Sequence, residues 1–231
     1  MEGITIYIST PSLFRSLVST LTGQEEFPKL RTIRLGAEQI RKSDIELYKK
    51  YFSEKCLLAL FLSATEAGNV CQYFVDKATE IPGDTVLAGR PVEGIEILLL
   101  DDSGKEVGPN ETGEIAVKSR FISPGYWRKP ELTATVFLPA GDQRVYRTGD
   151  LGRVTANGEL EHLGRKDFQI KIRGYRVELT EIESVLLQLD QIKEAIVTAV
   201  KSGNGDADLV AYIVPSRWPA LRASEFRKLL T

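Results

Sequence analysis

The apolar run "CLLALFLS" (56–63) constrains the fold more than any other stretch of the sequence. A continuous apolar segment of this length is typical of a β-strand that is covered on both faces. Strand-like segments also occur at 3–9 and 30–36, and helix-like segments follow them at 10–21 and 41–52. This alternation of strands and helices predicts a parallel sheet with helices packed against it.

Local signals support both helices. Thr10 is a typical N-cap residue, and Pro11 follows it at the first position of the expected helix. In the second helix, Ile45, Tyr48 and Phe52 recur at helical spacing and predict one apolar face. Because parallel sheets bind ligands at the carboxyl ends of their strands, the polar residues that follow these strands are candidates for a site.

The pattern changes at about residue 83. Segment 93–107 predicts a strand followed by a turn, and 113–119 alternates between apolar and polar residues. Segment 149–165 predicts a hairpin, because Asn157-Gly158 is a strong turn signal between two strand-like runs. We therefore expect an antiparallel β module.

The last part of the sequence predicts a small α+β lobe. Segment 167–173 alternates as a strand, and Thr180 with Glu183 predicts a capping box at the start of a helix. The apolar residues of that helix repeat at helical spacing: Ile182, Val185, Leu186 and Leu189. Strands are expected at 194–200 and 209–214.

These changes of pattern predict an α/β protein with two lobes. The expected division is a large lobe at 1–164 and a small lobe at 165–231, which includes the connecting segment. The large lobe consists of an α/β part, 1–82, and the β module, 83–164.

Composition excludes several classes of protein. The 231 residues carry a formal net charge of −2, which gives no electrostatic basis for binding nucleic acid or an anionic membrane. The longest aliphatic run, 97–100, is too short to span a bilayer. The first ten residues lack the basic and apolar regions of a signal peptide, so we expect a cytoplasmic protein.

Cysteine and histidine are scarce. Cys56 and Cys71 lie in apolar surroundings, which predicts buried free thiols in a reducing compartment. The single histidine is His162, and the sequence has no Cys-x-x-Cys pair, so a zinc site is not expected.

Polar residues gather at the expected strand ends. The segment "YRTGDLGRV" (146–154) places Asp150 between two arginines, and a carboxylate there would accept hydrogen bonds from both hydroxyls of a ribose. Thr65 and Glu66 would suit a phosphate with its magnesium ion, and Arg165 would add a directed donor. Each of these residues alone is more typical of a structural or solvated role than of a site. Neither a G-x-x-x-x-G-K-[ST] nor a G-x-G-x-x-G loop is present.

The order of the motifs resembles that of the adenylate-forming enzymes. The motifs are "LGAE" (35–38), "SATEAG" (63–68), "GRP" (89–91), "TGEIAVKSRFISPGYW" (112–127), "YRTGDL" (146–151) and "GRKDFQIKIRGYRVELTEIE" (164–183). The sequence is most similar to the C-terminal part of adenylation domains of nonribosomal peptide synthetases, including hybrid polyketide–peptide systems. The resemblance implies a truncated adenylate-forming fold with a partial parallel lobe and an incomplete C-terminal lobe.

The resemblance also implies an activity in two steps. An amino acid or other carboxylic acid reacts with ATP to give an acyl-adenylate and pyrophosphate. The acyl group then passes to the phosphopantetheine thiol of a carrier-protein domain. ATP and magnesium are the implied cofactors, and the carrier protein, the acid and the N-terminal part of the domain are the implied partners.

Roles for individual residues follow from the same resemblance. It assigns Asp150 and Arg165 to the ribose, Thr65 to the phosphate and Glu66 to magnesium. Further implied roles, grouped by function, are nucleotide contacts at Glu38 and Leu62, an acyl pocket lined by Gly36, Ala37, Ala59 and Phe61, a hinge at Asp167 and an approach for the pantetheine arm at Gly174.

The sequence departs from the family pattern at two points. Leu62 stands where an aromatic residue normally stacks on adenine, and Ser63 replaces a glycine. The phosphate-loop lysine and the lysine of the small lobe are expected outside residues 1–231. No catalytic residue is therefore predicted within residues 1–231, and the isolated chain is expected to be inactive. The alternatives are a degenerate nucleotide- or carrier-binding module and a fragment of an acyl-CoA ligase.

Overall fold

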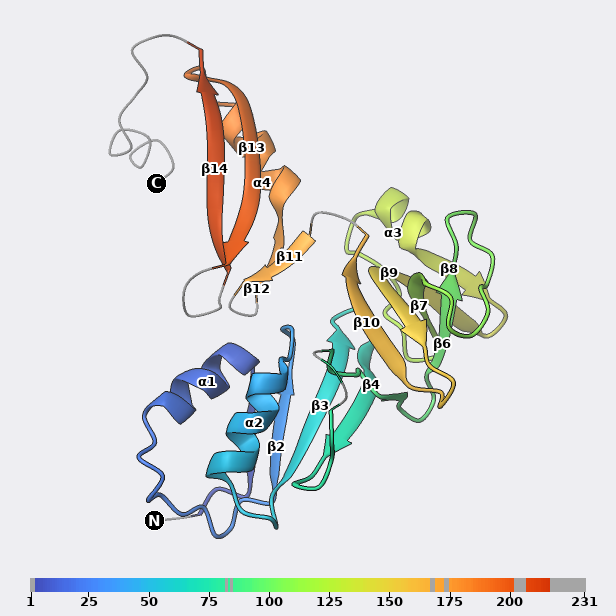
Figure 1. Ribbon diagram of the computed structural model, residues 1–231. Coiled ribbons are helices and arrows are strands. Elements are labelled where there is room, and N and C mark those ends of the chain that lie inside the picture. The colour runs from blue at the N-terminus through green and yellow to red at the C-terminus, as the bar shows by residue number, and fades with distance from the viewer. Residues whose placement is uncertain are drawn as a thin grey trace. The chain divides into compact units, whose positions relative to one another are not determined.

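The computed structural model describes residues 3–81, 83, 85–166, 169–172, 175–201 and 207–216. The chain divides into two compact units, residues 1–167 and residues 168–231 (Figure 1).

Unit 1 begins with three parallel strands joined by two helices. In chain order these elements are β1 (Ile6–Ser9), α1 (Pro11–Ser19), β2 (Thr32–Gly36), α2 (Lys42–Tyr51) and β3 (Leu57–Ala64). The strands lie side by side in the order β1-β2-β3, and both pairs are parallel. The predicted parallel sheet is therefore confirmed, and so is the cap of α1, where the Thr10 side chain accepts a hydrogen bond from the Leu13 N–H.

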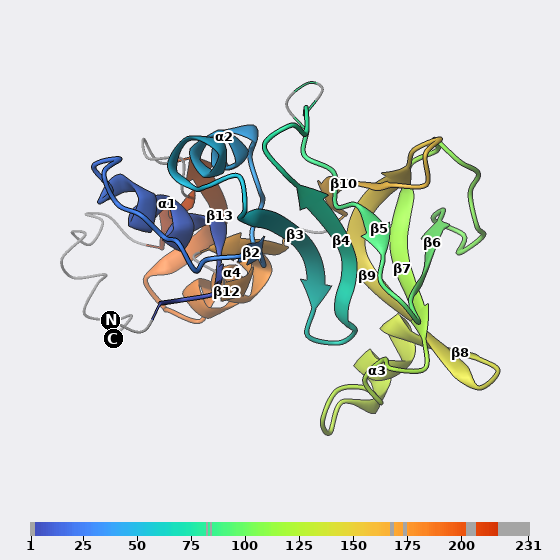
Figure 2. The same cartoon turned by 90° about the horizontal axis from the view of Figure 1, so that it is seen from below.

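Two further strands extend this sheet. β4 (Gly68–Val75) pairs antiparallel with β3, and β5 (Arg90–Pro91) pairs antiparallel with β4 (Figure 2). β4 was not predicted from the sequence. Its tight connection to β3 places residues 65–67 at the carboxyl end of β3, where ligands of such sheets bind.

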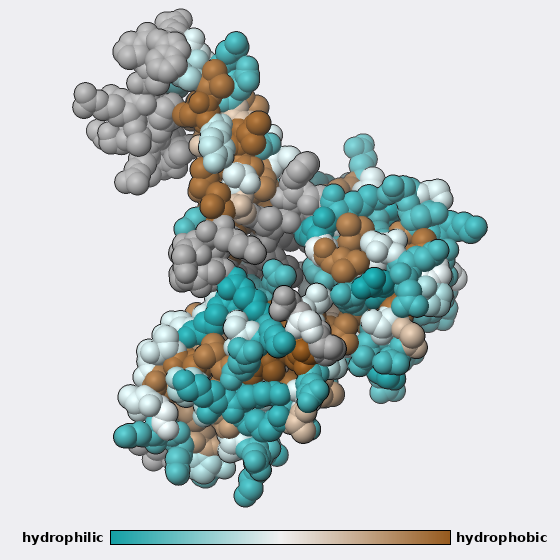
Figure 3. Space-filling view, viewed as in Figure 1, coloured by the Kyte–Doolittle hydropathy of each residue, from teal (hydrophilic) through white to brown (hydrophobic). Residues whose placement is uncertain are grey.

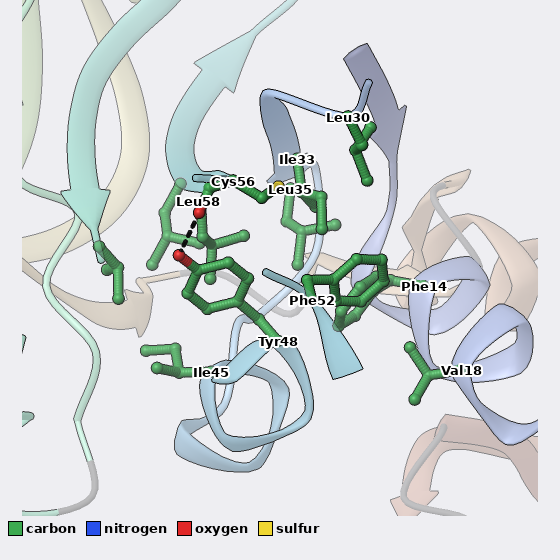
Figure 4. Packing of buried hydrophobic residues seen from close by; sticks show 12 residues of the cluster. Phe14, Val18, Leu30, Ile33, Leu35, Ile45, Tyr48, Phe52, Cys56 and Leu58 are labelled. Atoms are coloured by element: carbon green, nitrogen blue, oxygen red, sulfur yellow. Dashed lines mark hydrogen bonds between the residues drawn. The ribbon is translucent and has the colours of Figure 1, made fainter. Parts of the chain in front are cut away.

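Both helices pack on one face of the sheet. Phe14 and Val18 of α1 and Ile45 and Tyr48 of α2 are buried together with the inward residues of the strands (Figure 4). The phenol of Tyr48 donates a hydrogen bond to the Cys56 carbonyl, so this large side chain is buried with its polar group satisfied.

The other face of the sheet is more open. Ile6, Ile8 and Phe74 are each at least half exposed, whereas Ala59 on β3 is buried. The expectation that residues 56–63 are covered on both faces is thus met only in part, because α1 and α2 share one face.

The second sheet of unit 1 is antiparallel. Its strand order is β10-β9-β7-β6, and β8 pairs with β9. The elements are β6 (Glu96–Leu100), β7 (Gly113–Ser119), α3 (Pro130–Val136), β8 (Phe137–Ala140), β9 (Gln143–Val154) and β10 (Leu160–Arg165). The predicted β module and its hairpin at Asn157-Gly158 are confirmed, with Gly158 at a φ of 76°. α3 and β8 were not predicted.

Gly89 joins the two sheets. Its carbonyl accepts a hydrogen bond from the Leu160 N–H of β10 at 2.7 Å, and the Ala88 N–H donates to the Leu160 carbonyl at 2.8 Å. The φ of Gly89 is 86°, and a Cβ at this position would overlap the Gln72 carbonyl of β4. Only glycine fits here, which gives the "GRP" motif a structural reason.

Unit 2 is a small α+β structure. Its elements are β11 (Gln169–Ile172), β12 (Tyr175–Glu178), α4 (Leu179–Leu187), β13 (Ile192–Lys201) and β14 (Ala207–Pro215). β11 pairs with β12 and β13 pairs with β14, both antiparallel. The core of this unit joins α4 to β13 and consists of Leu179, Leu186, Ile192 and Val197.

Two details of α4 differ from the predictions. Glu178 is the N-cap and Glu183 accepts a hydrogen bond from the Val197 N–H at 2.8 Å, so the capping box of Thr180 and Glu183 is wrong. The Glu183 carboxylate binds the backbone of β13, whereas the local sequence pattern assigned it to the start of α4. Val185 is about half exposed, although the sequence pattern placed it on the apolar face of the helix.

Apolar side chains also lie on the outer face of the β13–β14 pair. Ile196 and Tyr212 are directly opposite each other and are both more than 60 % exposed. Figure 3 shows apolar residues on the surface of unit 2. Among the described residues, no helix has the length and apolar character that a bilayer span requires.

Candidate functional site

Asp150 and Arg165 form an ion pair across neighbouring strands. Asp150 on β9 pairs with Arg165 on β10, and Arg165 Nη1 lies 2.7 Å from Asp150 Oδ1. The same guanidinium nitrogen donates to the Thr148 carbonyl at 3.1 Å, which fixes its direction. Both side chains are mostly buried, so the pair is held in one geometry. The structure thus brings together the two residues that the sequence assigned to a ribose.

The register of β10 makes this pairing possible. A bulge between His162 and Gly164 shifts the pairing by one residue, so that Arg165 lies opposite Asp150. His162 Nε2 lies 3.7 Å from Asp150 Oδ1. Both neighbours contact Oδ1, and Oδ2 has no hydrogen-bond partner in the described part of the chain. The carboxylate therefore keeps an oxygen with which to accept a hydrogen bond from a ligand.

A second charged cluster lies beside this pair. Glu114 on β7 is buried and accepts hydrogen bonds from Arg147 Nη2 at 2.5 Å and the Gly149 N–H at 3.3 Å. Lys166 Nζ lies 3.9 Å from Glu114 and bonds to Asp102 at 2.5 Å. The hydrogen bond that Lys166 donates to Asp102 raises the pKa of Lys166. The cluster holds the backbone on both sides of Asp150 and Arg165, because the Lys166 N–H also donates to the Gly149 carbonyl.

Glu66 lies in the turn after β3 and is buried. Its Oε1 accepts a hydrogen bond from the phenol of Tyr126 at 2.8 Å. Its backbone carbonyl accepts a second one from the Ser123 N–H, also at 2.8 Å. Thr65 beside it is exposed. The turn therefore places one hydroxyl and one buried carboxylate next to each other at a strand end.

Glu38 has a structural contact that the sequence did not reveal. Its two carboxylate oxygens accept hydrogen bonds from the N–H and the hydroxyl of Ser12, at 3.0 and 2.8 Å. Ser12 is in the first turn of α1, where N–H groups lack helical partners and a negative charge is favourable. The carboxylate of Glu38 thus binds the start of α1. A contact between Glu38 and a nucleotide stays a prediction.

The predicted acyl-pocket residues lie close together. Gly36 on β2 is paired with Phe61 on β3, and a Cβ on Gly36 would meet the Phe61 ring at 2.5 Å. The Arg34 guanidinium lies 5.1 Å from the centre of the same ring. Ala59 is buried on β3, and Ala37 has a left-handed backbone with a φ of 65°. Phe61 therefore fills the space above Gly36.

Leu62 is partly buried and packs against the core that lies between the two sheets of unit 1. That core includes Ala67, Val70 and Cys71. Its predicted contact with adenine stays a prediction. The hinge Asp167 and the pantetheine-approach residue Gly174 lie outside the described residues.

A resident metal cluster is absent from the described residues, where no group of three or more His, Cys, Asp or Glu side chains could hold an ion. Mg²⁺ at a nucleotide site takes one or two protein carboxylates and completes its shell with phosphate oxygens and water. The single buried carboxylate of Glu66 fits that donor set.

A pocket of about 430 Å³ lies elsewhere on unit 1. Its lining includes Arg120, Phe137 and Arg144 and none of the predicted site residues. The chemical groups that the sequence singled out are at the strand ends and not in this pocket.

Three residues that hold the candidate site were not predicted from the sequence. Tyr126 binds Glu66, and Glu114 binds Arg147 on the strand that carries Asp150. The only signal for Tyr126 was its place in the motif "TGEIAVKSRFISPGYW". Glu114 and Arg147 are 33 residues apart, and only the pairing of β7 with β9 brings them together.

The fold defines an α/β protein with a candidate site at the strand ends of its larger unit, and comparison with known proteins identifies the family. Residues 1–127 match the family described as AMP-binding enzyme. The chain belongs to this family, which confirms the resemblance to adenylate-forming enzymes.

Curated relatives are nonribosomal peptide synthetases. The chain is 34 % identical over 223 residues to tyrocidine synthase 2 of Brevibacillus parabrevis, covering 95 % of the chain and 6 % of that protein. It is 36 % identical over 222 residues to surfactin synthase subunit 2 of Bacillus subtilis (strain 168), covering 91 % of the chain and 6 % of that protein.

Solved structures show the same fold. IdnL1 has a TM-score of 0.84 at 27 % identity, covering 96 % of this chain and 46 % of that one. PA1221, an NRPS protein containing adenylation and PCP domains, has a TM-score of 0.81 at 26 % identity. The match covers 98 % of this chain and 46 % of PA1221, so the chain spans about half the length of these neighbours.

Proposed function

We propose that this chain forms the ribose, metal and acyl side of an adenylation site that activates an amino acid or other carboxylic acid with ATP. A substrate carboxylate oxygen bonds to the α-phosphorus, and the bond from that phosphorus to pyrophosphate breaks. The products are an acyl-adenylate and pyrophosphate. The observation that carries the proposal is the Asp150–Arg165 pair, held in one register at the edge of the second sheet.

The chemistry of this pair suits a ribose. A carboxylate accepts hydrogen bonds from two vicinal hydroxyls, and its charge strengthens them. Arg165 holds Asp150 in place through Oδ1 and supplies a rigid donor beside it. Because both side chains are fixed before a ligand arrives, little conformational entropy is lost when it binds.

The turn after β3 supplies the phosphate end of the proposed site. Thr65 offers a hydroxyl to a phosphate oxygen, and Glu66 offers a buried carboxylate to Mg²⁺. When bound, the magnesium ion neutralises charge on the phosphates. The role of the chain is to hold a carboxylate at a defined place, since Glu66 is bound through both its side chain and its backbone.

The acyl side is formed by small and apolar residues. Phe61 fills the space above Gly36, and Ala37 and Ala59 have small side chains on the same strands or next to them. We propose that this surface borders the acid. The carboxylate of Glu38 binds α1, so the proposal for 36–38 concerns the backbone of this segment.

In the second half-reaction, the thiol sulfur of a carrier-protein phosphopantetheine attacks the acyl carbon and AMP leaves. We propose Asp167 as the pivot for this step and Gly174 as the approach of the pantetheine arm. Support for both residues is their place in the motif "GRKDFQIKIRGYRVELTEIE".

ATP–pyrophosphate exchange by the full-length protein tests the proposal. Exchange should depend on one acid in a panel of amino, aryl and fatty acids, and Asp150→Asn should reduce it at least 100-fold. Asp101→Asn is the matched control, because Asp101 binds the exposed turn of Ser103 and Lys105 and should leave exchange unchanged.

The possible results separate the alternatives. Nucleotide binding without exchange on any acid would indicate a binding module and contradict the proposal. With an active protein, acyl transfer to a phosphopantetheinylated carrier but not to coenzyme A supports the carrier-loading step. Transfer to coenzyme A alone would identify an acyl-CoA ligase.

A further inference from the structure

We infer that Tyr126 is a positioning residue that orients the Glu66 carboxylate toward the metal–nucleotide complex. The inference rests on the proposed magnesium role of Glu66. Its direct observation is the 2.8 Å hydrogen bond from the Tyr126 phenol to Glu66 Oε1.

This hydrogen bond restricts the carboxylate. The last torsion of a glutamate side chain is broad, so an unrestrained carboxylate samples many orientations. A donor on one oxygen selects the orientation of the carboxylate plane. Groups that orient a metal ligand in this way contribute about 10- to 100-fold to metal affinity.

Tyr126 is itself held firmly at both ends. Its N–H donates to Thr133 Oγ1 at 2.9 Å, and its carbonyl accepts from the Lys129 N–H at 3.2 Å. Its ring meets the Phe137 ring edge-on, with the centroids 5.3 Å apart and the planes at 73°. The phenol therefore cannot follow a displaced carboxylate, and this rigidity gives the contact its orienting effect.

The loop that carries Tyr126 is also tied to the turn of Glu66. The Ser123 N–H donates to the Glu66 carbonyl, so the backbone and the side chain of Glu66 are bound by residues three apart in the same loop. Gly125 between them has a φ of 134°, and a Cβ there would meet Thr133. The sequence S-x-G-Y thus forms a clamp, residues 123–126, around residue 66.

The same aromatic contacts connect the clamp to the strand of Asp150. Phe137 lies 5.1 Å from Tyr146, ring centre to ring centre, and Tyr146 is four residues before Asp150 on β9. Tyr126, Phe137 and Tyr146 therefore form one packed row. This row holds the proposed metal ligand and the proposed ribose ligand on a common support.

The test uses Tyr126→Phe in the full-length protein, which removes one oxygen and keeps the ring. We expect the half-saturating Mg²⁺ concentration for exchange to rise about tenfold. The rate at saturating Mg²⁺ should stay within about twofold, since the lost orientation is restored by mass action. A second readout is the affinity for Mn²⁺ in the presence of ATP, measured by electron paramagnetic resonance without turnover.

Tyr48→Phe is the matched control. It also removes a buried phenol hydrogen bond, from Tyr48 to the Cys56 carbonyl, but in the helix-facing core. It should lower stability without changing either metal readout. A metal affinity that falls equally in both variants would show a general effect of destabilisation and overturn the inference.

Glu66→Gln separates this inference from the proposed function. If Glu66→Gln leaves metal dependence unchanged, the magnesium role fails and the inference fails with it. If Glu66→Gln weakens the metal and Tyr126→Phe does not, only the positioning role is overturned. Tyr126→Phe should have no further effect in the Glu66→Gln background, and an additive effect there would also contradict the inference.

Discussion

Arg15 of α1 and Asp44 of α2 join the two helices through an ion pair in which the carboxylate is fully buried. Arg15 Nη1 lies 3.0 and 3.2 Å from the two oxygens of Asp44. Asp44 also accepts a hydrogen bond from the Arg41 N–H at 2.9 Å, which caps α2. One carboxylate thus fixes both a helix start and the packing of two helices.

The pair predicts an asymmetric response to mutation. Arg15→Ala should lower the free energy of unfolding by about 3 kcal/mol, because it leaves the buried Asp44 charge without its cation. Asp44→Asn in the Arg15→Ala background should recover part of this loss. Urea denaturation checks both values, and a double variant less stable than Arg15→Ala would contradict the expectation.

Glu38 should contribute more to stability than a solvated carboxylate. Glu38→Ala removes both hydrogen bonds to Ser12 at the start of α1, and we expect a loss of about 1–2 kcal/mol. Urea denaturation of Glu38→Ala, Ser12→Ala and the double variant measures the coupling. Glu26→Ala serves as a control for an exposed glutamate. Losses that simply add would show that the two residues do not interact.

Gly36 and Phe61 should be coupled by volume. Gly36→Ala puts a methyl group into the Phe61 ring, so we expect a destabilisation of about 1–3 kcal/mol. Phe61→Leu should relieve most of this cost, because a smaller side chain leaves room for the methyl group. Thermal denaturation of the single and double variants tests the coupling, and an equal effect of Gly36→Ala in both backgrounds would refute it.

The two cysteines should be unreactive in the folded protein. Burial raises the pKa of Cys71 to about 12 and also raises that of Cys56. The reactive form is the thiolate, so a thiol reagent at neutral pH should label neither residue until the protein is unfolded in guanidinium. Rapid labelling of native protein would contradict this.

The same pKa shift predicts a dependence on alkaline pH. The folded-state pKa of Cys71 lies above its ordinary value of 9.0, so its contribution to stability is complete below that value. It is lost as the pH rises toward 12. Cys71→Ala should therefore lose less stability than the parent between these limits, as measured by urea denaturation. An identical decline in both proteins would count against burial of the thiol.

The sequence predicted the elements whose signals are local. The parallel strands have apolar runs, α1 has Thr10 and Pro11, and the β9–β10 hairpin has Asn157-Gly158. Each of these signals lies within a few residues of the element that it predicts. β4 was missed because its sequence, 68–75, mixes polar and apolar residues without a clear period, and its pairing with β3 decides its structure.

The candidate site was predicted less completely, because its supports are distant in sequence. Asp150 and Arg165 were found from the motifs, but their pairing depends on the bulge in β10. Glu38 looked like a ligand because no local feature indicated Ser12, which is 26 residues earlier. Glu183 likewise fitted a capping box in the sequence, but in the structure its carboxylate binds the Val197 N–H. These polar residues were thus easier to predict from the sequence than the residues that they contact.

The bulge at His162–Gly164 has a consequence for how this gene can vary over evolutionary time. Codons can be gained or lost at the hairpin tip around Asn157-Gly158 without changing which residues face each other near Arg165. Loss of a single codon between that tip and Arg165 changes the register of β10, unless the bulge compensates for it. Without that compensation, the guanidinium of Arg165 lies on the opposite side of the strand. Length polymorphism among descendants of this sequence should therefore accumulate at the tip and be purged from the strand that follows it.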